Sequence, residues 1–249
     1  MNIFDAHCHI IETGFPLIEN QGFVPDYYSA ESYRIEAASL GVAAGAVVSG
    51  SFQGTDQSYL LAALKRLGDG YVGVTQLPPD VTDEEILRLD AAGVRALRFN
   101  LKRGGSVDPT SLERMAHRVH DLAGWHIELY ADVRDLADHV AMLRNLPQIS
   151  IDHLGLSEEG LPTLLRLVEA GARVKATGFG RIAGDIVRMI GAIVTTRTEA
   201  LVFGTDLPST RTRRFRRGDM DLLAETVGEK HREAVFYRNA ASLYRLPEA

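Results

Sequence analysis

The feature that most restricts the fold of this chain is a regular alternation of short β-branched segments with longer segments of helical periodicity. Strands that alternate with helices form a parallel sheet, and eight such units predict closure into a (β/α)8 barrel, the TIM-barrel fold. No linker or break in composition interrupts the series, so we expect one α/β domain over residues 1–249. The predicted strands are 3–10, 45–50, 71–77, 94–101, 126–132, 149–155, 173–179 and 200–208.

Helical patterns fill the intervals between these strands. Gly41 stands where a helix often ends, directly after the first of them. A doubly wound open sheet is the alternative architecture, but it usually carries a glycine-rich phosphate loop after its first strand. Here the first strand ends in histidines instead. The predicted helices are 30–41, 56–68, 82–93, 109–124, 136–147, 160–172 and 184–197, followed by a C-terminal helical region.

The first predicted strand places two histidines two residues apart, in "IFDAHCHI". Alternate side chains leave a strand on the same face, so Asp5, His7 and His9 are expected to point one way. Cys8 is expected to point the other way, with Phe4 and Ala6, as a buried structural thiol.

Polar side chains stand at the carboxyl ends of most predicted strands. In barrels of this type the active site is built from these ends, so polar residues there carry functional weight. Lys175 lies two residues before Thr177 in the seventh strand, and both are expected to face the barrel interior. The residues at or just after the strand ends are His7, His9, Arg98, Asn100, Tyr130, Asp132, His153, Thr177, Arg181 and Asp206.

Composition limits the partners of the chain. A net charge of -6 argues against nucleic acid and favours a small-molecule substrate. No apolar run reaches the roughly 20 residues of a membrane-spanning helix. A single cysteine excludes an intramolecular disulfide, and the first residues show no basic segment followed by a long apolar run. These features favour a cytoplasmic protein that does not act on a membrane.

Seven blocks of sequence run in order from the first strand to the last helix: "DAHCHI", "SFQGTDQSYLLAALK", "GVRALRFNL", "IDHLG", "VKATGFGR", "FGTDLP" and "NAASLY". Together they resemble the signature blocks of the amidohydrolase-related family, in the group around the 2-pyrone-4,6-dicarboxylate lactonases. The chain departs from that pattern at Leu207 and Ser209, where family members commonly have tryptophan and histidine. This departure leaves the substrate open.

The resemblance implies a hydrolase in which an aspartate after the eighth strand activates water against a lactone or similar ester carbonyl. By motif that aspartate is Asp206, and the histidine cluster is His7, His9 and His153. A carboxylate can take a proton from water and return it to the leaving alkoxide, while imidazoles stabilise charge on the carbonyl oxygen. Asp206 should then be ionised at rest, a state that nearby imidazole or guanidinium donors favour.

The substrate contacts are predicted from the same strand ends. Arg98 resembles a family position that grips a substrate carboxylate, which suits the two parallel donors of a guanidinium. The other interpretation of Arg98 is a structural ion pair across the top of the barrel. Arg103 and Arg181 could join it at the carboxylate. Tyr130 could hydrogen-bond the substrate or simply pack, and Ser51 is a further candidate contact.

The histidine cluster could also bind a metal. His7, His9, His153 and Asp206 could ligate one zinc or manganese ion and leave an open position for water. Metal-dependent branches that the sequence resembles normally have a histidine at the end of the fifth strand, where this chain has Tyr130. A neutral tyrosine is a poor replacement ligand. We therefore predict catalysis that requires no metal or other cofactor, with the three histidines as hydrogen-bond donors.

The expected activity is the hydrolysis of a lactone or related cyclic ester that bears one or more carboxylates. Three alternatives stay open: an isomerase of sugar-acid lactones, a zinc-dependent decarboxylase or amidohydrolase of the same superfamily, and a barrel that binds a ligand without chemistry. The segment "RTRRFRR", Arg211 to Arg217, follows the eighth strand and should lie over the catalytic face. It could attract anionic substrates or contact a second subunit of a homo-oligomer.

Overall fold

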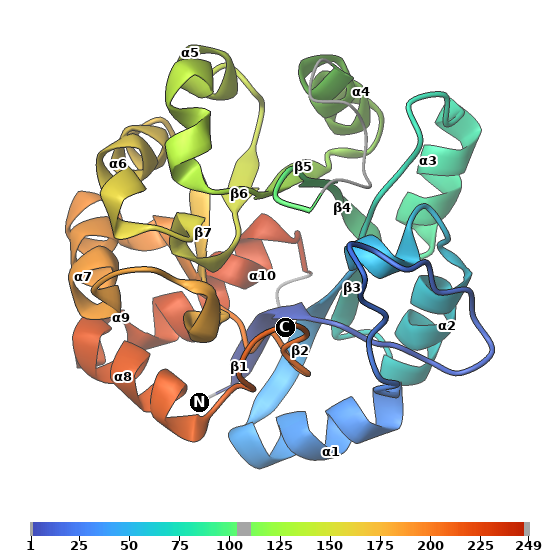
Figure 1. The fold of residues 1–249 in the computed structure, drawn as a ribbon, viewed down its shortest axis with the longest axis horizontal. Helices are drawn as coiled ribbons and strands as arrows, with labels where there is room; N and C mark the ends of the chain where they lie inside the picture. Colours follow the sequence, from blue (N-terminus) through green and yellow to red (C-terminus); the bar gives the residue numbers. More distant parts are fainter. Residues whose placement is uncertain (1, 104–110, 247–249) are drawn as a thin grey trace.

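The computed structural model describes residues 2–103 and 111–246. Eight strands lie at the centre of the molecule, and helices surround them (Figure 1). The strands are β1 (Ile3–Cys8), β2 (Val42–Val48), β3 (Tyr71–Thr75), β4 (Val94–Asn100), β5 (His126–Tyr130), β6 (Ile149–Ile151), β7 (Arg173–Ala176) and β8 (Leu201–Phe203). The helices are α1 (Ala30–Leu40), α2 (Ser58–Leu67), α3 (Asp83–Ala91), α4 (Leu112–Ala123), α5 (Val140–Leu143), α6 (Leu161–Glu169), α7 (Ile186–Thr196), α8 (Arg217–Val227), α9 (Glu229–Glu233) and α10 (Asn239–Leu243).

The strands form one parallel sheet in chain order, from β1 to β8. Backbone hydrogen bonds close the seam between the segments that end β1 and follow β8. The nitrogen of Asp206 donates to the oxygen of His7, and the nitrogen of His9 donates to the oxygen of Leu207, both at 2.7 Å. Gly204 permits this approach, because a Cβ at that position would lie 2.9 Å from the nitrogen of His7. The predicted (β/α)8 barrel is confirmed.

Local sequence signals account for the ends of several helices. The side chains of Ser29 and Thr82 cap α1 and α3 by accepting hydrogen bonds from the nitrogens of Ser32 and Glu85. Gly41 ends α1 as predicted, with a φ of 82° that favours glycine. Within residues 2–103 and 111–246, no helix combines the length and the apolar character that crossing a bilayer requires.

The C-terminal helix closes the amino-terminal end of the barrel. Apolar side chains from alternate positions of the strands fill this end and pack against α10 and the residue that follows it, Tyr244. The ring of Tyr244 stacks on Phe4 with centroids 5.4 Å apart, and its hydroxyl oxygen lies 3.2 Å from the oxygen of Ala6. The polar part of the interior is therefore at the opposite end, where the strands carry their carboxyl ends.

Strand β1 contains an extra residue. Gly45 and Val47 of β2 are two residues apart, yet they pair with Asp5 and Cys8 of β1, which are three apart. The extra residue makes a β-bulge, which breaks the regular alternation of side chains. Cys8 points outward into the layer between the strands and the helices, as predicted for a buried structural thiol.

The bulge corrects one prediction about the first strand. Ala6 and His7 are consecutive, and both face the barrel interior: Ala6 packs in the lower core and His7 reaches Lys175. Asp5 faces outward instead, where it accepts hydrogen bonds from the hydroxyls of Tyr33, at 3.0 Å, and Thr205, at 2.6 Å. The prediction that Asp5 shares a face with the histidines is wrong, because the bulge shifts the alternation by one residue.

The segment between β5 and β6 is also less regular than predicted. A continuous helix was expected over 136–147, but a 3₁₀ helix at Val133–His139 leads into the single short turn of α5. The backbone oxygen of Asp132 accepts a hydrogen bond from the nitrogen of Asp135, three residues later. This is the pattern of a 3₁₀ helix. Pro147 follows closely, so little chain is left for a regular α-helix.

Candidate active site

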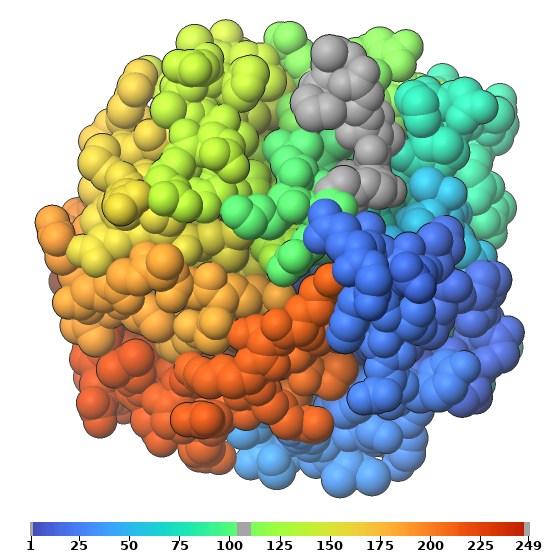
Figure 2. All heavy atoms as spheres, in the orientation of Figure 1, coloured from blue at the N-terminus to red at the C-terminus, as the bar shows by residue number. Residues whose placement is uncertain are grey.

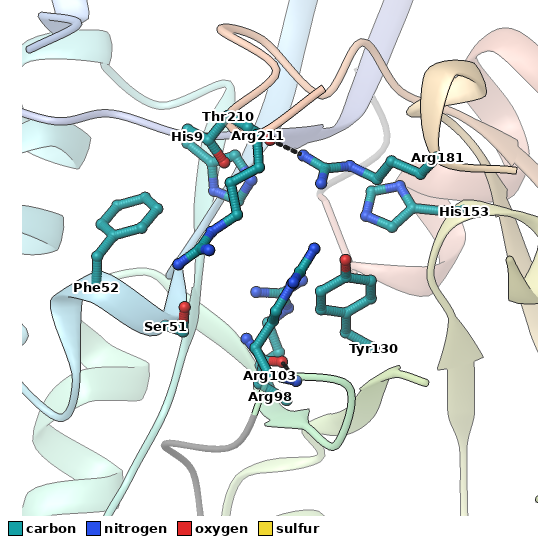
Figure 3. A pocket seen from close by; sticks show the side chains of 12 residues that line it. His9, Ser51, Phe52, Arg98, Arg103, Tyr130, His153, Arg181, Thr210 and Arg211 are labelled. Carbon is teal, nitrogen blue, oxygen red and sulfur yellow. Dashed lines mark hydrogen bonds between the residues drawn. The ribbon is translucent and has the colours of Figure 1, made fainter. Parts of the chain in front are cut away.

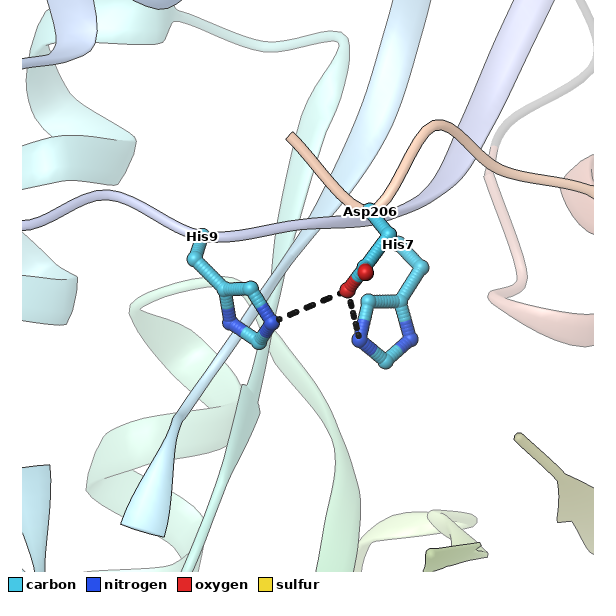
Figure 4. Close-up of side chains that lie close together, drawn as sticks. All are labelled: His7, His9 and Asp206. Carbon is cyan, nitrogen blue, oxygen red and sulfur yellow. Dashed lines mark ion pairs between the residues drawn. The ribbon is translucent and has the colours of Figure 1, made fainter. Parts of the chain in front are cut away.

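The four predicted catalytic side chains meet at the carboxyl ends of β1, β6 and β8. Nε2 of His9 lies 3.5 Å from Oδ1 of Asp206, and Nε2 of His7 lies 3.8 Å from the same oxygen (Figure 4). The ring of His153 lies beside that of His7, with centroids 4.9 Å apart. All four side chains are buried. The structure thus brings together the residues that the sequence assigned to one cluster.

Unusual backbone geometry places two members of this cluster. His153 and Asp206 have φ values of 51° and 61°, in the left-handed region that costs a non-glycine residue about 1 to 3 kcal/mol. Gly178 leaves space for the histidine, because a Cβ at that position would lie 2.5 Å from Nδ1 of His153. Such strain gathers at functional sites, where surrounding contacts hold it.

Asp206 is an ionised carboxylate in a buried position. Arg181 donates from Nε to Oδ2 at 2.9 Å, and its Nη2 is fixed by the oxygen of Thr210 at 2.7 Å. Burial alone would raise the pKa of Asp206, but the charge of Arg181 holds that pKa below its ordinary value. Among the described residues no side chain hydrogen-bonds Oδ1, which lies 3.5 Å from Nε2 of His9. This oxygen can therefore accept a proton.

A buried lysine in the barrel interior contacts His7. Nζ of Lys175 hydrogen-bonds Nδ1 of His7 at 3.5 Å, and Oδ1 of Asp152 lies 3.4 Å from the same nitrogen. An ammonium group can only donate, so in the bond with Lys175 Nδ1 accepts and the neutral ring carries its hydrogen on Nε2. Burial lowers the pKa of His7 to about 4, which keeps the ring neutral near pH 7.

His9 has the opposite arrangement of its ring nitrogens. Nδ1 lies 2.7 Å from the oxygen of Val48, and a carbonyl oxygen can only accept a hydrogen bond. Nδ1 therefore carries a hydrogen, and Nε2 faces Oδ1 of Asp206. The two histidines of the pair thus direct Nε2 at the same carboxylate oxygen.

Glu128 forms an ion pair inside the barrel that sequence reasoning did not identify. Lys175 donates to its Oε2 at 2.6 Å, Tyr244 donates to its Oε1 at 2.5 Å, and Nε2 of His126 lies 3.2 Å from Oε1. Burial would raise the pKa of Glu128, but Lys175 lowers it to about 2. The prediction that Lys175 faces the interior is confirmed. Glu128 lies two residues before Tyr130 in β5, so strand alternation would have predicted that its side chain also faces the interior, beside Lys175.

Arg98 forms a structural ion pair, which is one of the two roles that the sequence predicted for it. Its Nε and Nη2 donate to Oδ2 of Asp152 at 3.2 and 2.8 Å, and its Nη1 donates to the oxygen of Ser49 at 2.7 Å. The guanidinium also lies 5.2 Å from the centroid of the Tyr130 ring. Asp152 itself was not predicted, although it stands in the "IDHLG" block directly before His153.

A pocket lies above the cluster. Figure 3 shows the side chains of Arg98, Arg103 and Arg211 reaching into one space with Tyr130 and Arg181. Its described lining contains four arginines and no carboxylate side chain, so it suits an anion. All the predicted substrate contacts line it, namely Ser51, Arg98, Arg103, Tyr130 and Arg181, together with His9 and His153.

The arginine-rich segment after β8 divides into one pocket residue and several surface residues. Arg211 lines the pocket. Arg213 pairs with Asp219 at 2.7 Å, and Arg214 pairs with Glu36 at 2.5 Å, both away from it. Arg211 is therefore the member of this segment that can meet a substrate.

A divalent cation could find ligands here. One atom from each of His7, His9 and Asp206 lies within 4.8 Å of the others. Nε2 of His7 carries a hydrogen when Nδ1 accepts from Lys175, and it cannot ligate in that form. His7 would therefore have to shift that hydrogen before it could bind a metal.

The buried charges around the cluster balance without a metal. Arg98 pairs with Asp152, Lys175 pairs with Glu128, and Arg181 pairs with Asp206. Each pair is almost fully buried, so each charge needs its partner. A bound divalent cation would add positive charge to a set that is already neutral.

The buried histidines predict a loss of stability in acid. Burial lowers the pKa of both His7, to about 4, and His153, whereas a histidine of the unfolded chain titrates near 6.5. Between these values the unfolded chain binds protons that the folded chain does not, so the free energy of unfolding falls as the pH falls. For His7 alone, the loss by pH 4 is on the order of 3 kcal/mol.

Urea unfolding at neutral pH and at about pH 5 measures this loss. The carboxyls of Asp152 and Asp206 act only at lower pH, because their pKa values lie below the ordinary range. Replacing the exposed His117 by asparagine should leave the pH dependence unchanged, whereas His7→Asn should reduce it. Asp5 acts in the opposite direction, because burial raises its pKa to about 6. A pH dependence that is the same in His7→Asn as in the wild type would therefore contradict the neutral, buried state of His7.

The chain matches the family model described as amidohydrolase over residues 4–246. It is 28% identical over 233 residues to a 2-pyrone-4,6-dicarboxylate hydrolase of Comamonas testosteroni, an alignment that covers 82% of this chain and 76% of that one. It is 24% identical over 265 residues to a D-galactarolactone isomerase of Agrobacterium fabrum, covering 97% and 90%. A crystal structure from Agrobacterium tumefaciens superimposes with a TM-score of 0.91 at 22% identity, covering 99% and 97%, and shows the same fold.

Proposed function

This chain belongs to the amidohydrolase family, and on that premise we propose that it hydrolyses a lactone or related cyclic ester that bears a carboxylate. The observation that carries the proposal is the state of Asp206. One oxygen is fixed by Arg181, and the other faces two imidazoles without a hydrogen bond from any described residue. A carboxylate held in this way is suited to accept a proton from water.

Asp206 and His9 together define where the attacking water binds. Oδ1 of Asp206 and Nε2 of the neutral His9 ring are both acceptors, and they lie 3.5 Å apart. A water placed across them donates one hydrogen to each and directs a lone pair toward the pocket. As its oxygen bonds to the carbonyl carbon, its proton passes to Asp206. The ring C–O bond then breaks, and the departing alkoxide takes the proton back.

His7 stabilises the charge that develops on the carbonyl oxygen. Its Nε2 carries a hydrogen because Lys175 occupies Nδ1, and among the described residues no acceptor lies closer to that hydrogen than Asp206, at 3.8 Å. His153 lines the same pocket and is the second candidate donor. Donors that are fixed before the reaction lower the barrier because they need not reorganise as charge appears.

Catalysis in this proposal needs no metal. Three buried ion pairs already balance the charges, and the hydrogen on Nε2 of His7 performs the task of polarising the carbonyl. Were a divalent ion bound, His9, Asp206 and a rearranged His7 would hold it, and it would polarise the carbonyl instead.

We expect activity to survive removal of metal. The protein is dialysed against a chelator, elemental analysis establishes that metal is far below stoichiometric, and ester opening is then assayed. Turnover equal to that of the untreated protein supports the metal-free mechanism. If turnover disappears and returns with one equivalent of zinc or manganese, the histidine pair is a ligand pair and the metal-free mechanism is wrong.

The test of the function itself is a panel of aldonic, aromatic and pyrone lactones, assayed by acid release at constant pH. Hydrolysis releases one carboxylic acid for each ester opened. Isomerisation is the second candidate, favoured by the likeness to the galactarolactone isomerase along 97% of this chain. It would release no acid but would change the NMR spectrum of the lactone. If neither acid release nor a change in the NMR spectrum is seen for any lactone, the proposed lactone chemistry is wrong.

A further inference from the structure

Three segments that are far apart in the sequence meet at the mouth of the pocket. In Figure 2 the blue atoms that follow β1, the orange atoms that follow β8 and the green atoms near β4 and β5 come together at the centre of the face. Asn20, from the first of these segments, links the other two. Its Nδ2 donates to the oxygen of Arg103 at 3.3 Å, and its Oδ1 accepts from Nη2 of Arg211 at 3.3 Å.

A tight turn presents Asn20 and Phe23 to Arg211. Backbone hydrogen bonds of 3.0 and 3.2 Å join Asn20 and Phe23 in both directions. The two residues between them, Gln21 and Gly22, have φ values of 51° and 71°, as in the turns that favour glycine. Cζ of Arg211 lies 4.3 Å from the centroid of the Phe23 ring. The guanidinium is therefore held in place by a ring and by neutral oxygens.

The four arginines of the pocket differ in their charge partners. Arg98 and Arg181 are each paired with a buried aspartate. Over residues 2–103 and 111–246, neither Arg103 nor Arg211 has a carboxylate partner. Burial and the nearby charge of Arg103 both lower the pKa of Arg211. Two cations without a counter-charge from the described residues therefore face the same pocket.

The donors of these two side chains are also incompletely used. Nε of Arg103 is buried and has no hydrogen-bond partner among the described residues. Arg211 uses Nη2 on Asn20, and within the part of the chain that the structure describes its Nε and Nη1 donate to no other group. An anion between them would supply both the missing charge and the missing acceptors.

We propose that Arg211, with Arg103, is the anion subsite of this enzyme and determines its preference for a carboxylate on the substrate. This assigns the anion to the mouth of the pocket rather than to Arg98, whose paired donors already bind Asp152. The inference rests on the proposed function only in taking the anion to be part of the lactone substrate. A carboxylate anchored at the mouth leaves the ester carbonyl to reach the histidines below.

The experiment measures binding without turnover. Isophthalate and isophthalamide are flat, cannot be hydrolysed as lactones, and differ in charge at nearly constant shape. Calorimetry gives the dissociation constant of each for the wild type, Arg211→Met, Arg211→Lys and Arg214→Met. Arg214 is the matched control, because it belongs to the same segment but pairs with Glu36 outside the pocket.

We expect the wild type to prefer isophthalate, and Arg211→Met to reduce this preference by about 10- to 100-fold, as loss of a charge-assisted hydrogen bond predicts. Arg211→Lys should keep part of it, and Arg214→Met all of it. An unchanged preference in Arg211→Met, or an equal loss for both compounds, would overturn the subsite. Silence in the lactone panel with this preference intact would reject the proposed function alone.

Discussion

Replacing Asp206 by asparagine is expected to lower turnover by about 10² to 10⁴ while the barrel stays folded. An asparagine can still contact Arg181, but its amide has no basic oxygen that accepts a proton from water. The affinity for isophthalate should change little, because the mouth arginines lie apart from Oδ1. Initial rates on the best lactone of the panel measure the loss, and circular dichroism establishes the fold.

The matched control is Asp219→Asn, which removes a carboxylate that pairs with Arg213 on the outside of the barrel. It should turn over lactones at the wild-type rate. An Asp206→Asn variant that retains a rate within a few fold of the wild type would remove Asp206 from the mechanism. The water would then need a different base, and His9, whose Nε2 faces the same point, would be the first to examine.

Replacing Lys175 by methionine is expected to destabilise the protein by about 3 to 5 kcal/mol, the usual result of removing one partner of a buried ion pair. Glu128 would lose the ammonium at 2.6 Å, and Asp152 would lose the same ammonium at 3.6 Å, in a region fully buried from solvent. Urea unfolding measures the loss. Turnover should also fall, because Nδ1 of His7 would lose the donor that fixes its hydrogen on Nε2.

A second variant separates charge from packing. Lys175→Met combined with Glu128→Gln removes both charges, so it should recover part of the stability that the single change loses. Lys102→Met is the matched control, because its ammonium is partly exposed and pairs with Asp132 at 3.6 Å, a contact worth roughly 1 kcal/mol or less. A Lys175→Met protein as stable as the control would show that the buried pair contributes nothing.

The order and number of strands could be predicted from sequence because strands and helices differ in the spacing of their apolar residues. The bulge in β1 could not, because its cause is the pairing with β2, where Asp5 and Cys8 meet residues only two apart. Strict alternation then assigned Asp5 to the wrong face. The 3₁₀ helix before α5 was missed for a related reason: helical periodicity does not distinguish it from an α-helix over so few residues.

The candidate site was predictable where a residue stands at a strand end and less so where a distant partner decides its role. His7, His153 and Asp206 follow from position alone. Whether Arg98 holds substrate or Asp152 depends on a contact between strands β4 and β6, which no local pattern contains. Arg211 was noted only within a charged run, and its position over Phe23 requires the turn after β1.

The seam between β1 and β8 has a consequence for how the enzyme is made. The histidine pair leaves the ribosome before most of the barrel, whereas Asp206 and the backbone that bonds to His7 follow only with the eighth strand. A nascent chain that has already ordered most of its strands still lacks the carboxylate that we propose as the base. In the proposed mechanism catalysis therefore requires the completed circle, and turnover in a translation reaction would report the moment at which the last strand joins the first.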